Sequence, residues 1–393
     1  MTVRVNKQPF NIREKLSELE RPIGVKGSEL MRAETAQDAR DLVSAGRKNL
    51  IINGAMMVNQ RGTVVNAGNE YAGPDRMRFN KNDGAFTISQ STDVPTGQGF
   101  GYSWKADVTT VAGTSGNYYT FLQHRFEGQN FQSLKKGTSF AESFTLQFWI
   151  KSAVTGTYVV EIYDNDNNRS ISQSYTVNSS NTWEHKILTF PGDATGELDN
   201  DNNDSLEINC WLFAGSGYSS GTLNTSWNTQ NNANRAVGQV NAANNTSNDI
   251  YFTGFQLEVG KNATDFEHRS YGEELALCQR YYWEVGSYNN NNWAPITLVI
   301  AYNGTRAFGS IPTPVTMRAH PAVTFSTLNV YSSGSAIDVT NIFRYSQTNR
   351  DQEYNGLSFE VNTASGMSAG TVYRLHVRNV SGTSGYIRLN AEL

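Results

Sequence analysis

The chain has 393 residues with a formal net charge of −4, and this length predicts two or three domains. Only 17% of its residues are charged, while 11% are aromatic. This balance excludes the basic footprint of a nucleic-acid-binding protein and the aromatic-poor composition of a disordered chain.

Residues 1–49 differ from the rest of the chain because they predict short helices. In NIREKLSELERP, Ile12, Leu16 and Leu19 recur at helical spacing and form one apolar stripe, and TAQDARDLVSAG predicts a second capped helix. Helices of about ten residues are marginal alone, so we expect this stripe to contact a partner protein; a frayed terminus is the alternative. The segment begins without the apolar core of a signal peptide, and no membrane insertion is predicted anywhere in the chain.

Residues 50–268 read as short strands between polar loops, which favours a β-sandwich or jelly roll. Apolar residues alternate in FTLQFWIKS and in SLEINCWLF, as in strands with one buried face. The second strand places Cys210 on its apolar face, where it reads as a buried small side chain; a disulfide with Cys278 is left open. The loops at 192–205 and 214–248 are long for a compact domain, and such loops are often functional.

An acidic loop, ELDNDNNDSLE, places Asp199, Asp201, Asn203 and Asp204 within a few residues of one another. Hard cations such as Ca²⁺ prefer clustered oxygen ligands, so the loop is a candidate calcium site, although its spacing excludes an EF-hand. A plain polar turn explains the same residues, because Asp and Asn favour turns. No other cofactor is predicted.

Aromatic residues in the loops form a second group of candidates. Sugars bind to aromatic platforms flanked by amides and carboxylates, because a sugar ring has an apolar face and polar edges. The candidate glycan-binding residues are Tyr118, Tyr119, Tyr218, Trp227 and Trp293. For any one of them, packing in the core or at a subunit interface is the simpler interpretation.

The stretch DFEHRSYGEELALCQRYYW contains a thiol, an imidazole and several carboxylates. Ser270 and Glu273 have the spacing of a capping box, and Cys278 falls on the apolar face of the short helix that follows. A packed thiol is therefore favoured over a nucleophile paired with His268, since a reactive thiol needs an electropositive, partly exposed setting. We expect residues 269–283 to form a helix that links the jelly roll to a C-terminal β-sandwich at 284–393.

The chain resembles a known family in several segments. In order, RKNLIINGAMMVNQRG, FTLQFWIKS, TWEHKILTFPGD and GFQLEVGKNATDFEHRSYGEELALCQRYYW resemble tail fibre or tail-associated structural proteins of tailed bacteriophages. The N-terminal segment resembles the attachment segment of marine and cyanobacterial phage members, and PVTMRAHPAVTF resembles the start of their C-terminal β domain. The resemblance implies a carbohydrate-binding-module-like jelly roll, a homotrimer and a place in the virion. It supplies no catalytic residues.

Three functions compete on this basis. The first is a non-enzymatic tail fibre protein that is synthesised in the host cytoplasm, docks on other tail proteins (adaptor, nozzle or baseplate) through residues 1–49, and recognises a host surface polysaccharide or lipopolysaccharide. The second is a structural virion protein, such as a head decoration or tail connector, without receptor binding. The third is a depolymerase, which the absence of regular β-helix repeats disfavours.

Overall fold

The computed structural model describes residues 48–113, 116–286, 294–344, 356–378 and 385–393. The predicted N-terminal helices with Ile12, Leu16 and Leu19, and the candidate Trp293, lie outside the described residues. Within the described part, no helix has both the length and the apolar character needed to cross a membrane.

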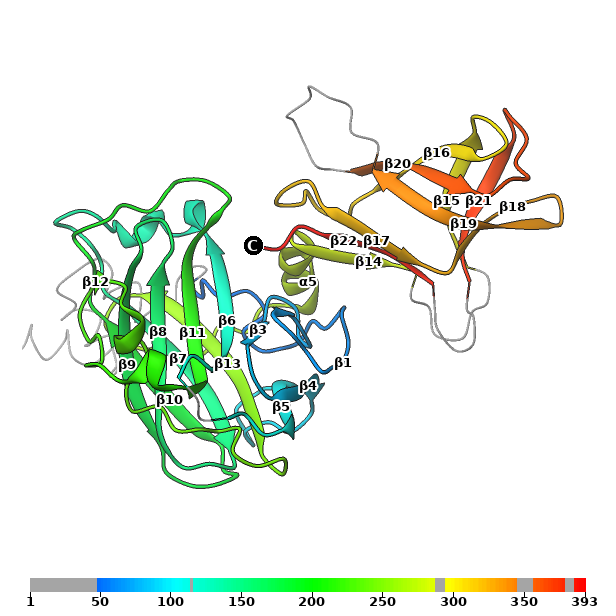
Figure 1. Cartoon of the computed structure of the whole chain (residues 1–393). Coiled ribbons are helices and arrows are strands. Elements are labelled where there is room, and N and C mark those ends of the chain that lie inside the picture. Colours follow the sequence, from blue (N-terminus) through cyan, green and yellow to red (C-terminus); the bar gives the residue numbers. More distant parts are fainter. Residues whose placement is uncertain (1–47, 114–115, 287–293, 345–355, 379–384) are drawn as a thin grey trace, which may run out of the picture.

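A two-sheet antiparallel β-sandwich forms the first part of the molecule, as predicted (Figure 1). Sheet A has the order β1 (Val64–Val65), β4 (Ala85–Ser91), β5 (Ser103–Thr110), β13 (Asp249–Val259), β7 (Phe144–Ser152) and β10 (Glu184–Phe190). Sheet B has the order β12 (Asn228–Thr229), β9 (Arg169–Val177), β8 (Gly156–Asp164), β11 (Asp204–Ala214), β6 (Tyr119–Glu127), β3 (Arg78–Lys81) and β2 (Glu70–Tyr71). Strands adjacent in space are often distant in sequence, as in a jelly roll.

The core lies between the inner faces of the two sheets. Alternate residues of each strand point inward, so that Phe148 of β7 and Phe252 of β13 meet Ile208 and Cys210 of β11 in one buried cluster. Fully burying each such side chain stabilises the fold by about 1.5–3 kcal/mol. Cys210 and Cys278 are both buried and free, so the disulfide that the sequence left open is not formed.

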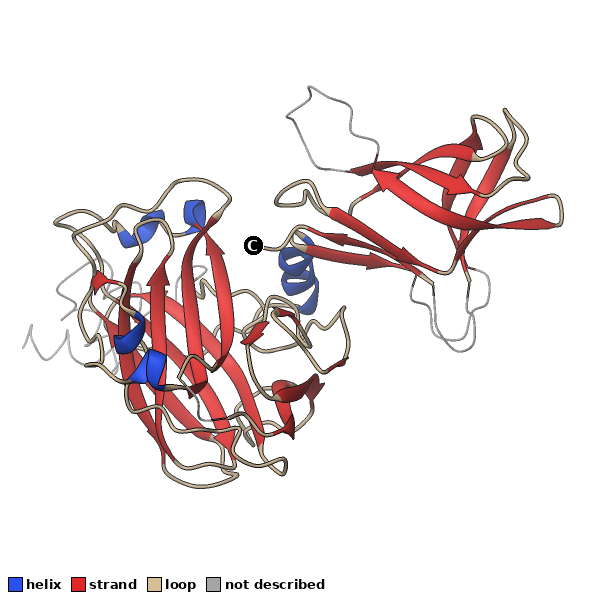
Figure 2. Ribbon diagram, in the orientation of Figure 1, coloured by secondary structure: helices blue, strands red, loops and turns tan. Residues whose placement is uncertain are grey.

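Short helices lie within the loops around the sandwich (Figure 2). They are η1 (Gly128–Asn130), η2 (Gln132–Leu134), α4 (Ser216–Ser219), η3 (Asn232–Asn234) and α5 (Tyr271–Gln279). The linking helix predicted over residues 269–283 is α5, and the backbone N–H of Glu273 donates to the Ser270 hydroxyl at 3.3 Å, as the capping pair predicts. The helix is shorter than predicted, because Tyr282 and Trp283 pair with a C-terminal strand instead.

The C-terminal region is β-structure, as expected, but its strands are not arranged as a sandwich. Six strands close into a barrel in the order β15 (Ala294–Ala301), β16 (Arg306–Pro312), β20 (Gly356–Thr363), β19 (Ser335–Arg344), β18 (Leu328–Ser332) and β21 (Val372–Val377). The barrel closes because β21 pairs with both β15 and β18, which leaves neither edge strand open. A separate sheet C contains β14 (Tyr282–Val285), β22 (Tyr386–Asn390) and β17 (Ala322–Ser326).

Ion pairs and hydrogen bonds tie the C-terminal region to the sandwich. The Glu392 carboxylate accepts from Arg61 at 2.8 Å and from Arg76, and the Arg76 side chain is 1% exposed. On the same junction, Arg280 donates two bonds to Glu127 at 2.7 and 2.8 Å. These contacts place sheet C beside the edge of sheet B that β3 and β2 form.

Candidate functional site

The outer face of sheet B carries a continuous row of polar side chains. Because the strands pair in register, outward-facing residues of neighbouring strands lie directly opposite one another. The row, called the polar row below, consists of Tyr71, Arg78, Gln123, Asn209, Glu161 and Ser172, on β2, β3, β6, β11, β8 and β9. It crosses the sheet perpendicular to the strands.

Hydrogen bonds connect the members of this row to one another. The Arg78 guanidinium donates to Gln123 Oε1 at 3.0 Å, and Gln123 Nε2 donates to Asn209 Oδ1 at 2.9 Å. Asn209 Nδ2 in turn donates to Glu161 Oε2 at 3.3 Å, and Glu161 accepts three bonds of 2.8 to 3.0 Å from Arg235. Donors and acceptors are therefore fixed in space before any ligand arrives, which lowers the entropic cost of binding.

An aromatic row lies next to the polar row, toward one end of the strands. Phe121 of β6 is opposite Trp211 of β11, with ring centroids 5.1 Å apart. Tyr119 stacks on Phe121 at 5.5 Å, and Tyr218 of α4 contacts both Tyr119 at 5.6 Å and Trp211 at 5.5 Å. The structure thus brings together two of the predicted aromatic residues, Tyr119 and Tyr218.

The long loop at 214–248 folds over the aromatic row. The Ser172 hydroxyl donates to the Arg235 carbonyl at 2.8 Å, and Arg235 lies 5.2 Å from the Trp211 ring and 5.8 Å from the Tyr218 ring. Trp211 is fully buried beneath the loop. The loop that the sequence marked as functional therefore forms one wall of the site.

The candidate site is the part of the outer face of sheet B that lies beside this wall, and it is called the groove below. Its floor consists of the buried side chains of Gln123, Glu207, Asn209 and Glu161. Its rim consists of the partly exposed side chains of Arg78, Arg125, Tyr163 and Arg235. The mixture of amides, carboxylates, guanidinium groups and one phenol ring can match the hydroxyl groups and the apolar face of a sugar.

Two carboxylates in the groove share one cation. Arg125 pairs with Asp204 at 3.2 Å and with Glu207 at 3.1 Å. Burial, together with the charge of Glu207, raises the pKa of Asp204 to about 8, because two adjacent buried carboxylates resist ionising together. This pair therefore retains a proton near neutral pH and can donate a hydrogen bond.

The remaining predicted residues lie elsewhere. Tyr118 and Trp227 are partly buried against the core cluster of the sandwich, and the Trp227 indole donates to the Pro191 carbonyl at 2.8 Å. Lys136, whose Nζ lies 5.1 Å from the centre of the Trp227 ring, adds a cation–π contact. These two aromatic residues do not join the groove on sheet B.

The acidic loop does not gather its side chains around one point. Asp201 accepts from the backbone N–H of Asn203 at 2.8 Å, and the backbone N–H of Asp199 donates to Asp166 at 2.9 Å, while Asp204 turns toward Arg125. In the described part of the chain, no three His, Cys, Asp or Glu side chains are placed to hold a metal ion. The contact between Asp201 and Asn203 is of the kind that Asp and Asn form in polar turns.

Sequence reasoning did not select the amides and charged residues of the groove. Gln123, Asn209, Glu161 and Arg235 belong to three different strands and a loop, and only the strand register brings them together. The available signal was local: Glu207 and Asn209 alternate with apolar residues in LEINCW, which predicts that they share one face of a strand.

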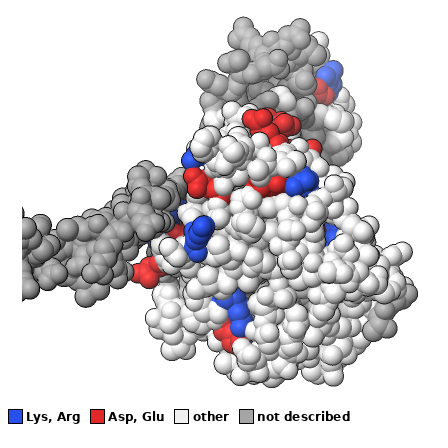
Figure 3. Space-filling view, turned by 90° about the vertical axis from the view of Figure 1, so that its left-hand side faces the viewer, with Lys and Arg blue, Asp and Glu red and all other residues white. Residues whose placement is uncertain are grey.

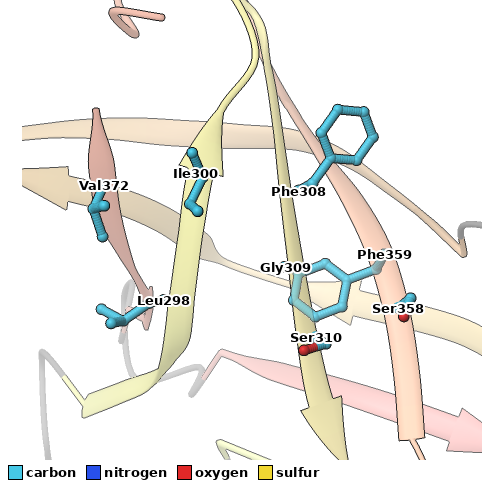
Figure 4. A pocket seen from close by; sticks show the side chains of 8 residues that line it. All are labelled: Leu298, Ile300, Phe308, Gly309, Ser310, Ser358, Phe359 and Val372. Atoms are coloured by element: carbon cyan, nitrogen blue, oxygen red, sulfur yellow. The ribbon is translucent and has the colours of Figure 1, made fainter. Parts of the chain in front are cut away.

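A second hollow, of about 590 Å³, lies on the outside of the barrel (Figure 4). It is lined by Leu298, Ile300, Phe308, Gly309, Ser310, Ser358, Phe359 and Val372. Its polar groups are two serine hydroxyls, with no charged side chain in the lining. The groove on sheet B is therefore better suited to orient a polar ligand.

Comparisons with known proteins add structural likenesses of low similarity. No protein-family model matches the chain, and no curated protein is similar to it in sequence. An enzymatically active domain of bacteriophage CBA120 tailspike protein 4 is 16% identical, with a TM-score of 0.30, and the match covers 54% of this chain and 21% of the tailspike domain.

Two carbohydrate-binding modules give similar results. A family 61 module bound to β-1,4-galactotriose is 9% identical over 54% of this chain and 99% of the module, with a TM-score of 0.28. A family 11 module of Clostridium thermocellum is 14% identical over 53% of this chain and 98% of the module, with a TM-score of 0.25. These TM-scores are too low to support an inference about the function of this chain.

Proposed function

We propose that the chain is a glycan-binding protein that uses the groove on the outer face of sheet B. The polar row is the observation that carries this proposal: side chains from adjacent strands form one hydrogen-bonded array beside a partly exposed aromatic ring, Tyr163. Sugar hydroxyls both donate and accept hydrogen bonds, so the partly exposed polar groups at the rim of this array, on Arg78, Arg125 and Tyr163, can satisfy several of them at once.

Charged side chains of the described residues do not gather into one large patch on the side of the molecule that Figure 3 shows. One side of the sandwich shows few Lys, Arg, Asp or Glu side chains, and these occur as small mixed patches (Figure 3). Such a surface offers no strong long-range attraction for a charged polymer. Contacts at short range, through the amide, guanidinium, carboxylate and phenol groups of the groove, are then the source of specificity.

We place this activity in a bacteriophage tail fibre, which the sequence resemblance supports. In this proposal, residues 1–49 attach the chain to other tail proteins and the β domains recognise a glycan on the host surface. Several copies, as in a homotrimer, would multiply weak binding at each groove. Electron microscopy of particles labelled on this chain tests its location in the tail. Labelled density on the capsid facets would contradict the tail fibre assignment.

We propose binding without hydrolysis of the glycan. Asp204 and Glu207 are close enough to share a proton and Arg125, whereas glycosidases hold their two carboxyl groups about 5 Å or more apart to leave room for chemistry at the sugar. Glu161 is committed to Arg235. Release of reducing ends from host polysaccharide by the purified chain would contradict this part of the proposal.

A mutation on the rim tests the groove directly. Tyr163→Ala is expected to weaken glycan or host-cell binding about tenfold, since losing one stacking ring costs about 1 kcal/mol or more. Tyr302→Ala, which removes a 65% exposed ring on the barrel, is the matched control and should bind like the wild type. Equal binding by both variants in a glycan-array or cell-binding assay would contradict the proposal that the glycan binds in the groove on sheet B.

One observation favours a purely structural role instead. The floor residues Gln123, Asn209 and Glu161 are at most 3% exposed, and buried polar networks also serve to stabilise a fold. Under this alternative the virion protein binds no receptor, and the wild-type chain would bind neither host cells nor any glycan on the array.

A further inference from the structure

The junction between the sandwich and sheet C contains a groove of about 600 Å³, here called the interdomain groove. Arg61, Tyr71 and Arg78 line it from the sandwich, while Tyr282, Arg388 and Asn390 line it from the C-terminal region. This volume lies within the roughly 300–1,000 Å³ of ordinary ligand sites. Three guanidinium groups from three separate segments of the chain therefore face one hollow, together with the carboxylates of Glu70 and Glu392.

Two of these guanidinium groups already have carboxylate partners. Arg61 pairs with Glu392 at 2.8 Å and lies 3.7 Å from the centre of the Tyr282 ring. Arg388 pairs with Glu284 at 2.6 Å. These contacts hold both side chains in place and make the wall of the groove rigid.

Arg78 differs because it has only neutral partners. Within the described part of the chain it forms no ion pair; it donates to the amide oxygens of Asn80 and Gln123 and, at 3.4 Å, to the Asn69 carbonyl. Burial and the nearby charge of Arg125 lower the pKa of Arg78. The charges of Glu207 and Asp204 act on Arg78 without forming an ion pair with it. An anion entering the groove would supply that direct contact and lower the cost of burying the cation.

Arg78 also connects this groove to the proposed glycan site. It is a member of the polar row, opposite Gln123 of β6 on one side and next to Tyr71 of β2 on the other. A glycan that lies over the rim of the groove on sheet B and reaches Arg78 would therefore place one of its units in the interdomain groove. Tyr71, Asn390 and Asn69 supply further polar groups at that end.

We propose that the interdomain groove binds an acidic sugar unit of the glycan, with Arg78 as the partner of its carboxylate. This inference rests on the proposed function, because the glycan reaches the interdomain groove from the proposed site on sheet B, to which Arg78 also belongs. The planar fork of a guanidinium matches a carboxylate with two parallel hydrogen bonds. The chain then discriminates acidic polysaccharides from neutral ones through one residue.

The test compares acidic glycans with their neutral forms on the full chain. Oligosaccharides of polygalacturonate and of alginate are each paired with their carboxyl-reduced counterparts, and a sulfated galactan serves as an anion of different geometry. The wild type is expected to bind a carboxylated form about tenfold or more tightly than its reduced counterpart, as charge-assisted hydrogen bonds predict. The sulfated galactan should gain less, because tetrahedral sulfate does not match the planar fork.

Variants separate this inference from the proposed function. Arg78→Gln should lose the preference for the carboxylated form, measured as the ratio of the two affinities within the same variant, because Arg78 also belongs to the polar row and its loss can weaken binding of both forms. Arg374→Gln, which removes an exposed arginine from the barrel, should keep the preference. Equal binding of both forms by the wild type, or a preference that survives in Arg78→Gln, overturns the acidic-sugar site alone. Absence of binding to every glycan, acidic or neutral, overturns the proposed function as well.

Discussion

Glu161 shows how the polar row depends on single ion pairs. Its carboxylate is fully buried and accepts a bidentate bond from Arg235, whose side chain is 14% exposed. A buried charge whose partner is removed is left without compensation, which costs far more than the net contribution of the pair. The floor of the groove is therefore stable only while the loop at 214–248 supplies its cation.

Removing that cation should destabilise the sandwich. Arg235→Met is expected to lower the free energy of unfolding by about 3–5 kcal/mol, because Glu161 then remains charged and buried. Lys151→Met, which breaks the partly exposed pair with Asp93, is the control and should cost about 0–1 kcal/mol. Urea denaturation measures both, and similar losses in the two variants would show that the loop does not stabilise the groove.

Asp204 should make stability depend on pH. Its pKa is raised from 3.8 in the unfolded chain to about 8 in the folded state, so between these values the folded state binds the additional proton. Stability from this group is complete below about pH 4 and is lost as the pH rises toward 8. Asp204→Asn should therefore gain stability relative to the wild type at pH 8 more than at pH 5. Denaturation at the two pH values measures this, and an equal difference at both would contradict the raised pKa.

At the scale of strands, features that depend on neighbouring residues were predicted correctly, and features that depend on the pairing of distant strands were not. Alternation correctly placed Cys210 among inward-facing residues of its strand, and the capping pair correctly located α5. Trp211 was not predicted, because it begins the apolar run WLFA at the end of β11, where both faces of the strand are buried and no polar residue alternates. The closure of the barrel was also missed, since it depends on the pairing of β21 with β18, which no local pattern specifies.

The candidate site could be predicted only in part, for the same reason. Tyr119 and Tyr218 were selected as loop aromatics, yet their contact joins residues about a hundred positions apart. Gln123, Asn209 and Glu161 look like ordinary strand residues until the register of β6, β11 and β8 aligns them. A site built across strands is a property of pairing, whereas the sequence reports each strand separately.

Gly309 provides a test of close packing within one element. A Cβ at this position of β16 would lie 2.7 Å from Val299 Cγ1 and 3.2 Å from Phe359 Cζ. Gly309→Ala is therefore expected to destabilise the barrel by about 1–3 kcal/mol through overpacking. Gly304→Ala, where the nearest atom is 3.6 Å away, should stay within about 0.5 kcal/mol. Hydrogen exchange of peptides from β15 and β16 measures both; equal protection would show that the barrel absorbs the added methyl group.

At the scale of the whole molecule, Glu392 joins the two parts of the chain. Its carboxylate lies beside two guanidinium groups, Arg61 and Arg76, and the second is packed 3.6 Å from the centre of the Tyr281 ring. The interdomain groove lies at this junction and includes Glu392 in its lining. The geometry of the acidic-sugar site proposed there therefore depends on the ion pairs of Glu392 with these two guanidinium groups.

Neutralising Glu392 should loosen the junction. Glu392→Gln leaves Arg76, which is 1% exposed, without an anion, so we expect a loss of about 3–5 kcal/mol in stability and faster proteolysis between the sandwich and sheet C. Small-angle scattering should show a larger radius of gyration as the two parts separate. The control is Glu142→Gln, which removes an exposed pair with Lys135 and should change none of these measurements. If Glu392→Gln retains the compact scattering profile and the protease resistance of the wild type, the hydrogen bonds from Arg280 to Glu127 and from Arg318 to the Asn202 carbonyl hold the junction without Glu392. The groove then does not require this carboxylate.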